Sequence, residues 1–118
     1  MHISFLQQDN TAIAHVESED IIISNTQDAV ELLMNCHYQG ADSIIMAEHN
    51  LPAEFFDLKT KMAGDILQKF STYDSRLAII GDFSKFESKS LHDFIYESNK
   101  GRRINFVSSL NEAVEKLK

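Results

Sequence analysis

The chain is poor in the residues that form cross-links, sharp turns and metal clusters. Its 118 residues include one cysteine, one proline, four glycines and no tryptophan. A lone cysteine, Cys36, excludes a disulfide framework and a cysteine-rich metal site. Because Cys36 falls at an apolar position of a helical pattern, we expect it to lie in the core.

Several motifs that mark enzymes are also missing. The four glycines are isolated from one another, which excludes a glycine-rich phosphate loop and a dinucleotide-binding fingerprint. No nucleophile elbow is present. The five histidines include no pair at the spacing of metal ligands on one helix. The sequence therefore predicts no metal and no cofactor.

Long apolar runs and an excess of positive charge are absent as well. No stretch approaches the length of a membrane-spanning helix, and no basic and apolar leader opens the chain. We therefore expect no transmembrane segment and a cytoplasmic location. The net charge of −7 argues against nucleic acid as a partner, because phosphate-binding proteins concentrate Lys and Arg.

What is present is enough apolar material for one core. Hydrophobic residues make up 43% of the chain, and its length is typical of one domain. We predict a single domain over residues 1–118. Its composition is that of a chain that folds without a partner.

The order of apolar patterns predicts an α/β fold with one mixed sheet and about four helices. A hairpin of two strands opens the chain, and the run Ile21-Ile22-Ile23 is interpreted as a further strand. A helix then ends near Gly40, which suits a left-handed conformation. The remaining segments alternate, with strands at 43–47, 76–80 and 103–107 and helices at about 52–70, 88–99 and 109–117. Strands joined through helices run parallel, so the sheet combines an antiparallel hairpin with parallel strands.

Four blocks in the second half of the chain have a distinctive residue order. They read Phe55-Phe56-Asp57-Leu58-Lys59-Thr60, Ala63-Gly64 with Ile66-Leu67-Gln68-Lys69-Phe70, Leu77-Ala78-Ile79-Ile80-Gly81-Asp82-Phe83, and Ser88-Lys89-Ser90-Leu91-His92-Asp93-Phe94-Ile95-Tyr96-Glu97-Ser98-Asn99. These blocks resemble a bacterial family known only as a domain of unknown function. The similarity runs over almost the whole chain and implies no activity.

The order of elements is also similar to the SpoIIAA-like, or STAS, fold, whose members open with strands and then alternate strand and helix. This resemblance implies a regulatory or interaction domain. Anti-sigma-factor antagonists of that fold carry a phosphorylatable serine at the helix start after the central strand. The matching stretch here has no serine and reads Ala47-Glu48-His49-Asn50-Leu51-Pro52.

Polar residues follow the predicted parallel strands, at the sheet edge where open α/β sheets bind ligands. We expect a site for a partner or ligand formed by Glu48, His49, Asn50, Phe56, Asp57, Lys59, Asp82, Phe83 and Ser84. Its expected occupant is a protein partner or a small amphiphilic ligand. The ligand would require an apolar cavity lined by Phe55, Phe56 and Phe83.

Lys59 supports an alternative function. It falls within the apolar arc of the predicted helix at 52–70, and a desolvated lysine has a depressed pKa that suits catalysis. The alternative is a small enzyme that uses Lys59 with His49 and Asp82 as an acid/base or nucleophilic set. The structural interpretations are a snorkelling Lys59 paired with Asp82 and an exposed loop histidine at position 49.

Gly64 lies inside the same predicted helix, where glycine costs on the order of 1 kcal/mol relative to alanine. Two reasons for it remain open, namely close packing within the domain and a homodimer interface along the helix. Basic residues gather between Lys85 and Arg103, and we interpret them as a solvated face rather than an anion site.

Overall fold

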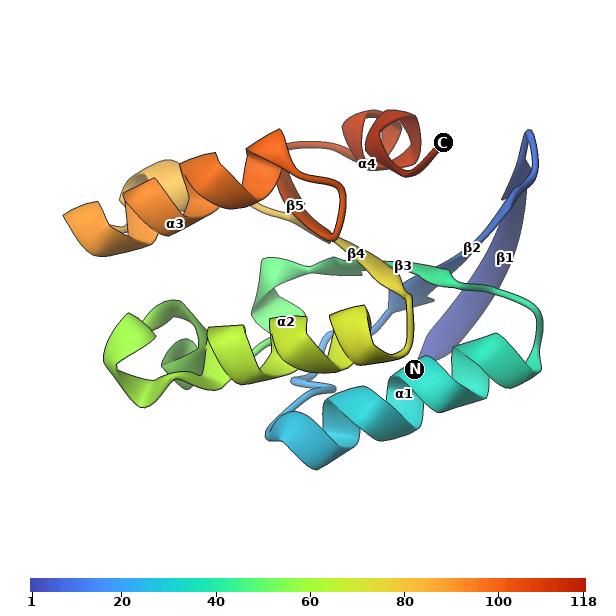
Figure 1. Ribbon diagram of the computed structural model, residues 1–118, viewed down its shortest axis with the longest axis horizontal. Coiled ribbons are helices and arrows are strands. Elements are labelled where there is room, and N and C mark those ends of the chain that lie inside the picture. Colours follow the sequence, from blue (N-terminus) through green and yellow to red (C-terminus); the bar gives the residue numbers. More distant parts are fainter.

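The computed structural model describes residues 1–118, which form one five-stranded sheet with helices on both faces (Figure 1). The strands are β1 (His2–Gln8), β2 (Thr11–Glu17), β3 (Ser43–Ala47), β4 (Arg76–Ile80) and β5 (Ile104–Val107). The α-helices are α1 (Thr26–Tyr38), α2 (Met62–Thr72), α3 (Lys89–Lys100) and α4 (Leu110–Leu117). β1 and β2 pair antiparallel, and β2 to β5 pair parallel. The predicted fold class is confirmed.

The strand order β1-β2-β3-β4-β5 follows the sequence, so each strand pairs with the next one along the chain. All three crossovers between parallel strands therefore advance in the same direction across the sheet. Because such crossovers are right-handed, their helices must lie on one face. α1, α2 and α3 accordingly contribute to one core cluster, whereas α4 packs against the opposite face (Figure 1).

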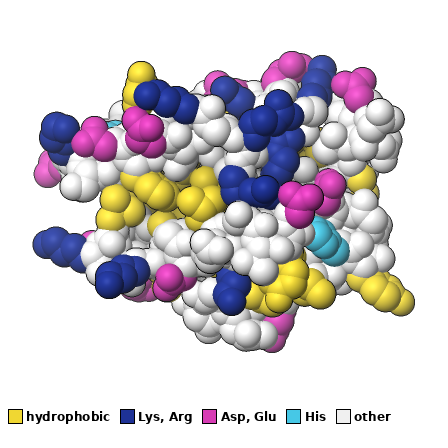
Figure 2. Space-filling view, in the orientation of Figure 1, with side chains coloured by type: hydrophobic (Ala, Val, Ile, Leu, Met, Phe, Trp, Pro, Cys, Tyr) yellow, Lys and Arg dark blue, Asp and Glu magenta, His cyan; other side chains and the backbone are white.

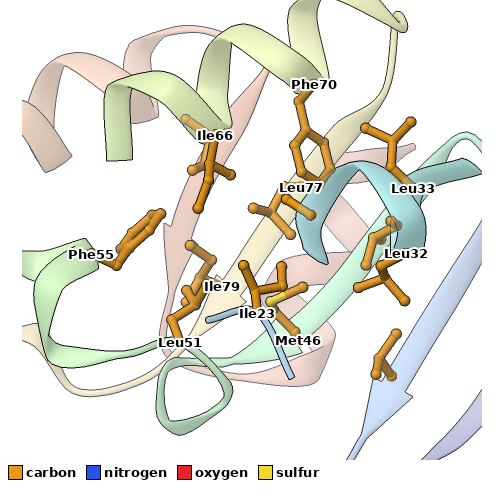
Figure 3. Close-up of a cluster of buried hydrophobic side chains, with 14 of the residues drawn as sticks. Ile23, Leu32, Leu33, Met46, Leu51, Phe55, Ile66, Phe70, Leu77 and Ile79 are labelled. Atoms are coloured by element: carbon orange, nitrogen blue, oxygen red, sulfur yellow. The ribbon is translucent and has the colours of Figure 1, made fainter. Parts of the chain in front are cut away.

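Side chains alternate between the two faces of each strand and divide the core in two. The larger cluster has 21 buried residues and includes Met46, Phe70 and Leu77, which lie between the sheet and the helices (Figure 3). The smaller cluster has six buried residues under α4. Its members are Ile13, Ile45, Ala78, Val107, Ala113 and Leu117.

Several element ends follow the local signals of the sequence. Asn25 caps α1 by accepting a hydrogen bond from the backbone N–H of Asp28 at 2.8 Å, and Gly40 follows this helix with a φ of +96°. Ser88 and Ser109 cap α3 and α4 in the same way. The caps at Ser88 and Ser109 confirm the predicted starts of α3 and α4.

The prediction of a strand at Ile21-Ile22-Ile23 is wrong. The segment has no strand partner, and the N–H groups of Ile22 and Ile23 donate instead to the backbone carbonyl of Asn50, at 2.9 and 3.3 Å. Ile23 is fully buried in the larger cluster, whereas Ile21 is 51% exposed. The apolar run therefore anchors a loop to the core rather than adding to the sheet.

The prediction of one long helix over residues 52–70 is also wrong. Two short 3-10 turns, Ala53–Phe56 and Leu58–Thr60, precede α2. Asp57 separates the turns in an extended conformation, and Lys61 is left-handed with a φ of 65°. An α-helical hydrogen-bond ladder cannot pass through these two conformations. The apolar pattern here reflects burial of Phe55 and Phe56 from separate turns.

Gly64 lies in the first turn of α2 and is exposed. A Cβ atom built at this position would meet no atom within 4 Å, so close packing within the fold is not the reason for the glycine. The homodimer interface along this helix stays a prediction. None of the helices is both long enough and apolar enough to cross a bilayer.

Cys36 is fully buried in α1, as predicted, and burial raises the pKa of its thiol from the ordinary 9.0 to about 11. The unfolded chain loses this proton near its ordinary pKa, whereas the folded chain retains it up to the raised pKa. Below the ordinary pKa the thiol is protonated in both states and does not change the free energy of unfolding. As pH rises from the ordinary pKa to the raised pKa, the thiol lowers the free energy of unfolding.

We expect the free energy of unfolding to fall by about 1 kcal/mol between about pH 8 and about pH 10 through Cys36 alone. Urea denaturation of the wild type and of Cys36→Ala at a series of pH values measures this contribution. The difference between the two curves should narrow as pH rises, because alanine has no proton to lose. If the free energies of unfolding of the two proteins change in parallel with pH, Cys36 is not the source of the pH dependence.

Candidate functional site

The ends of β3 and β4 lie side by side and bring two of the predicted loops into contact. Glu48 follows β3, and one oxygen of its carboxylate lies 2.8 Å from the ammonium of Lys85 in the loop after β4. Its other oxygen accepts a hydrogen bond from the backbone N–H of Asp82 at 3.2 Å. The Glu48 side chain is only 16% exposed. It therefore ties the two loops together and has little capacity left for a ligand.

Gly81, between β4 and Asp82, allows this contact. A Cβ atom at position 81 would lie 2.8 Å from both Cγ and Oε1 of Glu48 and 2.9 Å from its Cβ. Carbon atoms in contact normally stay about 3.5 Å or more apart. The absence of a side chain at this position thus lets the Glu48 carboxylate reach the Asp82 backbone.

Asp82 is engaged within its own loop. Its carboxylate accepts hydrogen bonds from the hydroxyl and the backbone N–H of Ser84, at 2.5 and 3.1 Å. The hydroxyl of Ser84, followed by its N–H, lowers the pKa of Asp82 below the ordinary value. The carboxylate therefore stays ionised at neutral pH and is a poor acceptor for a substrate proton.

Asn50 is the most buried of the predicted site residues, at 1% exposure. Its side-chain amide donates to the carbonyls of Ser18 and Asp20, at 2.8 Å each, and its Oδ1 accepts from the N–H of Ala47 at 3.0 Å. His49 is exposed and donates from Nε2 to the Ser18 carbonyl at 2.7 Å. Asn50 is thus a clamp that fixes the loop after β2 to the end of β3.

Lys59 does not lie on an apolar helix face, and that expectation is wrong. It is exposed within the second 3-10 turn and forms no ion pair with Asp82, Glu48 or any other carboxylate. Its backbone N–H donates to Asp57, which caps the turn, at 3.1 Å. The structure thus does not join Lys59, His49 and Asp82 into one hydrogen-bonded set.

The predicted aromatic residues form a packed cluster rather than a shared cavity. Phe56 stacks on Phe86 with ring centroids 4.9 Å apart and meets Phe55 edge-on at 5.0 Å. Phe83 meets Phe106 edge-on at 5.2 Å. No hollow in the structure is lined by Phe55, Phe56 and Phe83 together. Phe56 and Phe83 line separate hollows, so the single apolar cavity expected for an amphiphilic ligand is not formed.

Three hollows lie at this end of the sheet. One of about 520 Å³ has Glu48, His49 and Phe56 in its lining, and one of about 400 Å³ has Asp82 and Phe83. The third lies on the face that α4 shares. Its volume is about 480 Å³, and it runs along the ends of β2, β3 and β4. The residues that line it are His15, Val16, Glu17, Ser18, Glu19, Ala47, His49, Asn50 and Ile80. Of the predicted site residues, only His49 and Asn50 contribute to it.

The size of α4 explains why this part of the sheet is uncovered. A helix of eight residues is about 12 Å long and about 10 Å wide, whereas five strands span about 19 Å. α4 packs mainly over β4 and β5. Leu6, His15, Ala47 and Ile80 lie beside it on the same face and are half-buried. We call these four residues the open face.

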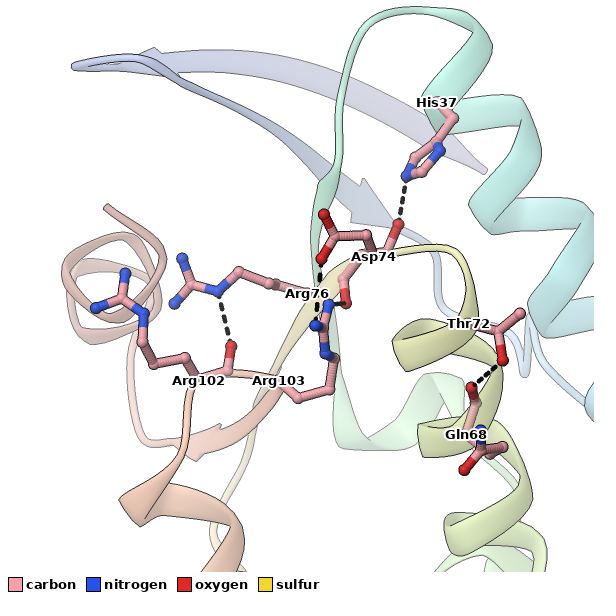
Figure 4. A network of polar contacts seen from close by, with 8 residues as sticks. His37, Gln68, Thr72, Asp74, Arg76, Arg102 and Arg103 are labelled. Atoms are coloured by element: carbon pink, nitrogen blue, oxygen red, sulfur yellow. Dashed lines mark hydrogen bonds and ion pairs between the residues drawn. The ribbon is translucent and has the colours of Figure 1, made fainter.

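The arginine cluster at the opposite end of the sheet has a structural role. Arg76 donates to the carbonyl of Arg102 at 2.7 Å (Figure 4). It also donates to the carbonyls of Leu117 and Lys116 at the end of α4. Arg103 donates to the Ser75 carbonyl at 2.6 Å. Burial, followed by the neighbouring arginines, lowers the pKa of Arg76. These guanidinium groups are occupied by backbone carbonyls. The interpretation of the basic residues between Lys85 and Arg103 as a solvated face stays a prediction.

Comparison with known proteins places the chain in a family. The model of DUF4180, a domain of unknown function, matches residues 8–117. The chain belongs to the DUF4180 family. The predicted resemblance to a domain of unknown function is therefore confirmed.

The DUF4180 chain is also similar to a solved structure, the crystal structure of a candidate anti-sigma factor antagonist from Thermotoga maritima. The sequences are 13% identical, the match covers 98% of this chain and 93% of that chain, and the TM-score is 0.48. The search of curated proteins finds no match.

Sequence reasoning missed the residues of this DUF4180 domain that form the open face. His15, Ala47 and Ile80 lie within or at the ends of strands, whereas the predicted site consists of residues after the strands. The strand order supplies the reason. A sheet whose order never reverses has no crevice between oppositely placed helices, so the hollow forms on the face that the crossover helices leave bare.

Proposed function

We propose that this DUF4180 domain is a regulatory interaction module that binds a partner protein on the open face. The observation that carries the proposal is the hollow of about 480 Å³ beside α4, at the end of the sheet where the parallel strands terminate. Half-buried apolar side chains form its floor, and exposed polar residues form its rim. A shallow surface of this kind suits a protein segment.

The state of the polar residues supports binding over catalysis. Glu48 is neutralised by Lys85, Asp82 is held ionised by Ser84, and His49 is hydrogen-bonded to a backbone carbonyl. A general base or nucleophile requires a group that is aimed at a substrate and activated by a neighbour. The enzyme alternative lacks a contact among Lys59, His49 and Asp82. The amphiphilic-ligand alternative lacks a cavity lined by the three phenylalanines.

Photo-crosslinking tests the proposal. A benzophenone amino acid replaces His49, which is exposed and lines the hollow, and the protein is irradiated in a lysate of its source organism. The control carries the same group at Gln68, which is exposed on α2 on the opposite face. Mass spectrometry identifies the adducts, and each identified protein is then purified and titrated against the domain.

The expected result is one protein that crosslinks from position 49, fails to crosslink from position 68 and binds the domain when purified. Adducts that form equally from both positions would contradict the proposal. The absence of any protein adduct from position 49 would contradict it as well.

A further inference from the structure

Charge is divided unevenly along the chain. The first 58 residues contain ten of the 18 acidic residues and none of the 11 Lys and Arg residues. Because the strand order follows the sequence, this half of the chain builds one end of the sheet, with β1, β2, β3 and α1. In the view of Figure 2, Lys and Arg side chains gather over α2, α3, α4 and the adjoining loops, whereas α1 contains no Lys or Arg. We call this end of the sheet, whose own segments carry no Lys or Arg, the acidic end.

The open face lies at this acidic end. Glu17 extends β2 on the same face as His15, and Glu19 follows in the loop that Asn50 clamps. We call Glu17 and Glu19 the rim carboxylates. Both line the hollow and both are exposed.

The rim carboxylates lack a cationic partner from Lys or Arg. The nearest basic group is the imidazole of His15, whose Nδ1 lies 3.9 Å from the Glu17 carboxylate. The one lysine in the adjoining loops, Lys85, is paired with Glu48 at 2.8 Å. The negative charge of the rim is therefore available to a binding partner.

We propose that the open face binds a basic amphipathic helix of a partner protein, an inference that rests on the proposed function. The apolar side of the helix packs on Leu6, Ala47 and Ile80, in the space beside α4. Its Lys or Arg side chains pair with the rim carboxylates. Helices in contact lie about 8–10 Å apart, so one more helix fits the uncovered strands next to α4.

Charge selects this occupant from the alternatives. An acidic segment would meet Glu17 and Glu19 with like charge, and an anionic membrane would be repelled for the same reason. A second copy would bring its own acidic end if it bound symmetrically. A basic helix gains both apolar contact and ion pairs, and its affinity should fall as salt screens the rim.

Two synthetic helical peptides test the inference. Both have about 18 residues, about 27 Å as a helix, with the same leucine face. The polar positions carry lysine in one peptide and glutamate in the other. Each is titrated into the isotope-labelled domain, with backbone amide shifts to locate binding and fluorescence anisotropy to measure affinity.

The lysine peptide is expected to shift the amides of His15, Ala47 and Ile80 and to bind at least tenfold more tightly than the glutamate peptide. The affinity should fall at least tenfold between about 50 mM and about 300 mM salt. The double variant Glu17→Lys/Glu19→Lys should lose at least tenfold in affinity. The control Asp65→Lys/Glu87→Lys makes the same change in net charge away from the open face and should retain most of the binding.

Other outcomes separate this inference from the proposed function. Equal or tighter binding of the glutamate peptide at the same amides would overturn the basic partner and leave the open face as a docking surface. Equal losses in the two double variants would overturn the pairing with the rim carboxylates. Shifts confined to α2 and α3, or no shifts, would overturn the helix-binding inference, while the crosslinking experiment judges the proposed function separately.

Discussion

Replacing Asn50 with alanine is expected to lower the free energy of unfolding by about 3 kcal/mol. The substitution removes three hydrogen bonds at a residue that is 1% exposed. The carbonyls of Ser18 and Asp20 and the N–H of Ala47 lose the partner that the Asn50 side chain supplies, although His49 still donates to Ser18. Each hydrogen bond contributes about 1 kcal/mol net, so the loss of three amounts to about 3 kcal/mol. Urea denaturation monitored by circular dichroism measures the change.

Two further variants make the test specific to the clamp. Asn111→Ala truncates an exposed asparagine on α4 and should change the free energy of unfolding by less than about 0.5 kcal/mol. Asn50→Asp retains an acceptor for the N–H of Ala47 but loses the donors, so it should be nearly as harmful as alanine. A stable Asn50→Asp protein would show that the amide donors do not matter.

Gly81→Ala should destabilise the domain by about 2 kcal/mol, the typical cost of forcing an extra carbon into a packed site. The new Cβ would lie 2.8 Å from Cγ and Oε1 of Glu48, and the contact at 2.9 Å with the Glu48 Cβ leaves that side chain little room to turn away. Displacement of Glu48 would also weaken its ion pair with Lys85. Thermal and urea denaturation measure the loss.

The partner of this clash can be identified by a double-mutant cycle. Glu48→Gly removes all three atoms that the new Cβ would meet, so Gly81→Ala should cost much less in that background. Gly101→Ala is the matched control, because its Cβ would lie 3.7 Å from the Ser98 carbonyl, an ordinary contact. If the costs of Glu48→Gly and Gly81→Ala simply add, the clash lies elsewhere.

The sequence was sufficient for the elements whose ends carry local signals. Asn25, Ser88 and Ser109 cap helices with their own side chains, and Gly40 takes the left-handed conformation that the sequence predicts. These effects depend on residues within a few positions, so one sequence is enough to infer them.

The failures occurred where distant contacts decide the outcome. Ile22 and Ile23 read as strand, but the carbonyl of Asn50 takes their hydrogen bonds. Residues 52–70 repeat apolar side chains at helical spacing. Lys61 nevertheless adopts a left-handed conformation, and no glycine at this position predicts it from the sequence. Tertiary packing overrides local preference in both segments.

The same division holds for the candidate site. The loops after β3 and β4 were found because polar residues follow buried strands, and the structure brings Glu48 and Asp82 together. The open face was not found, because its existence depends on strand order and on the shortness of α4. The absence of Lys and Arg from residues 1–58 is visible in the sequence, and this uneven charge could have predicted the acidic end of the sheet.

The sequential strand order also bears on how the protein forms in the cell. Each strand pairs with the one synthesised just before it, so the sheet can grow as the chain leaves the ribosome, without waiting for residues near the end. Pairing between neighbours keeps the contact order low for an α/β protein, which favours rapid folding. Only the small cluster beneath α4 has to wait for the final residues, and its face is the last part of the molecule to be shielded from water.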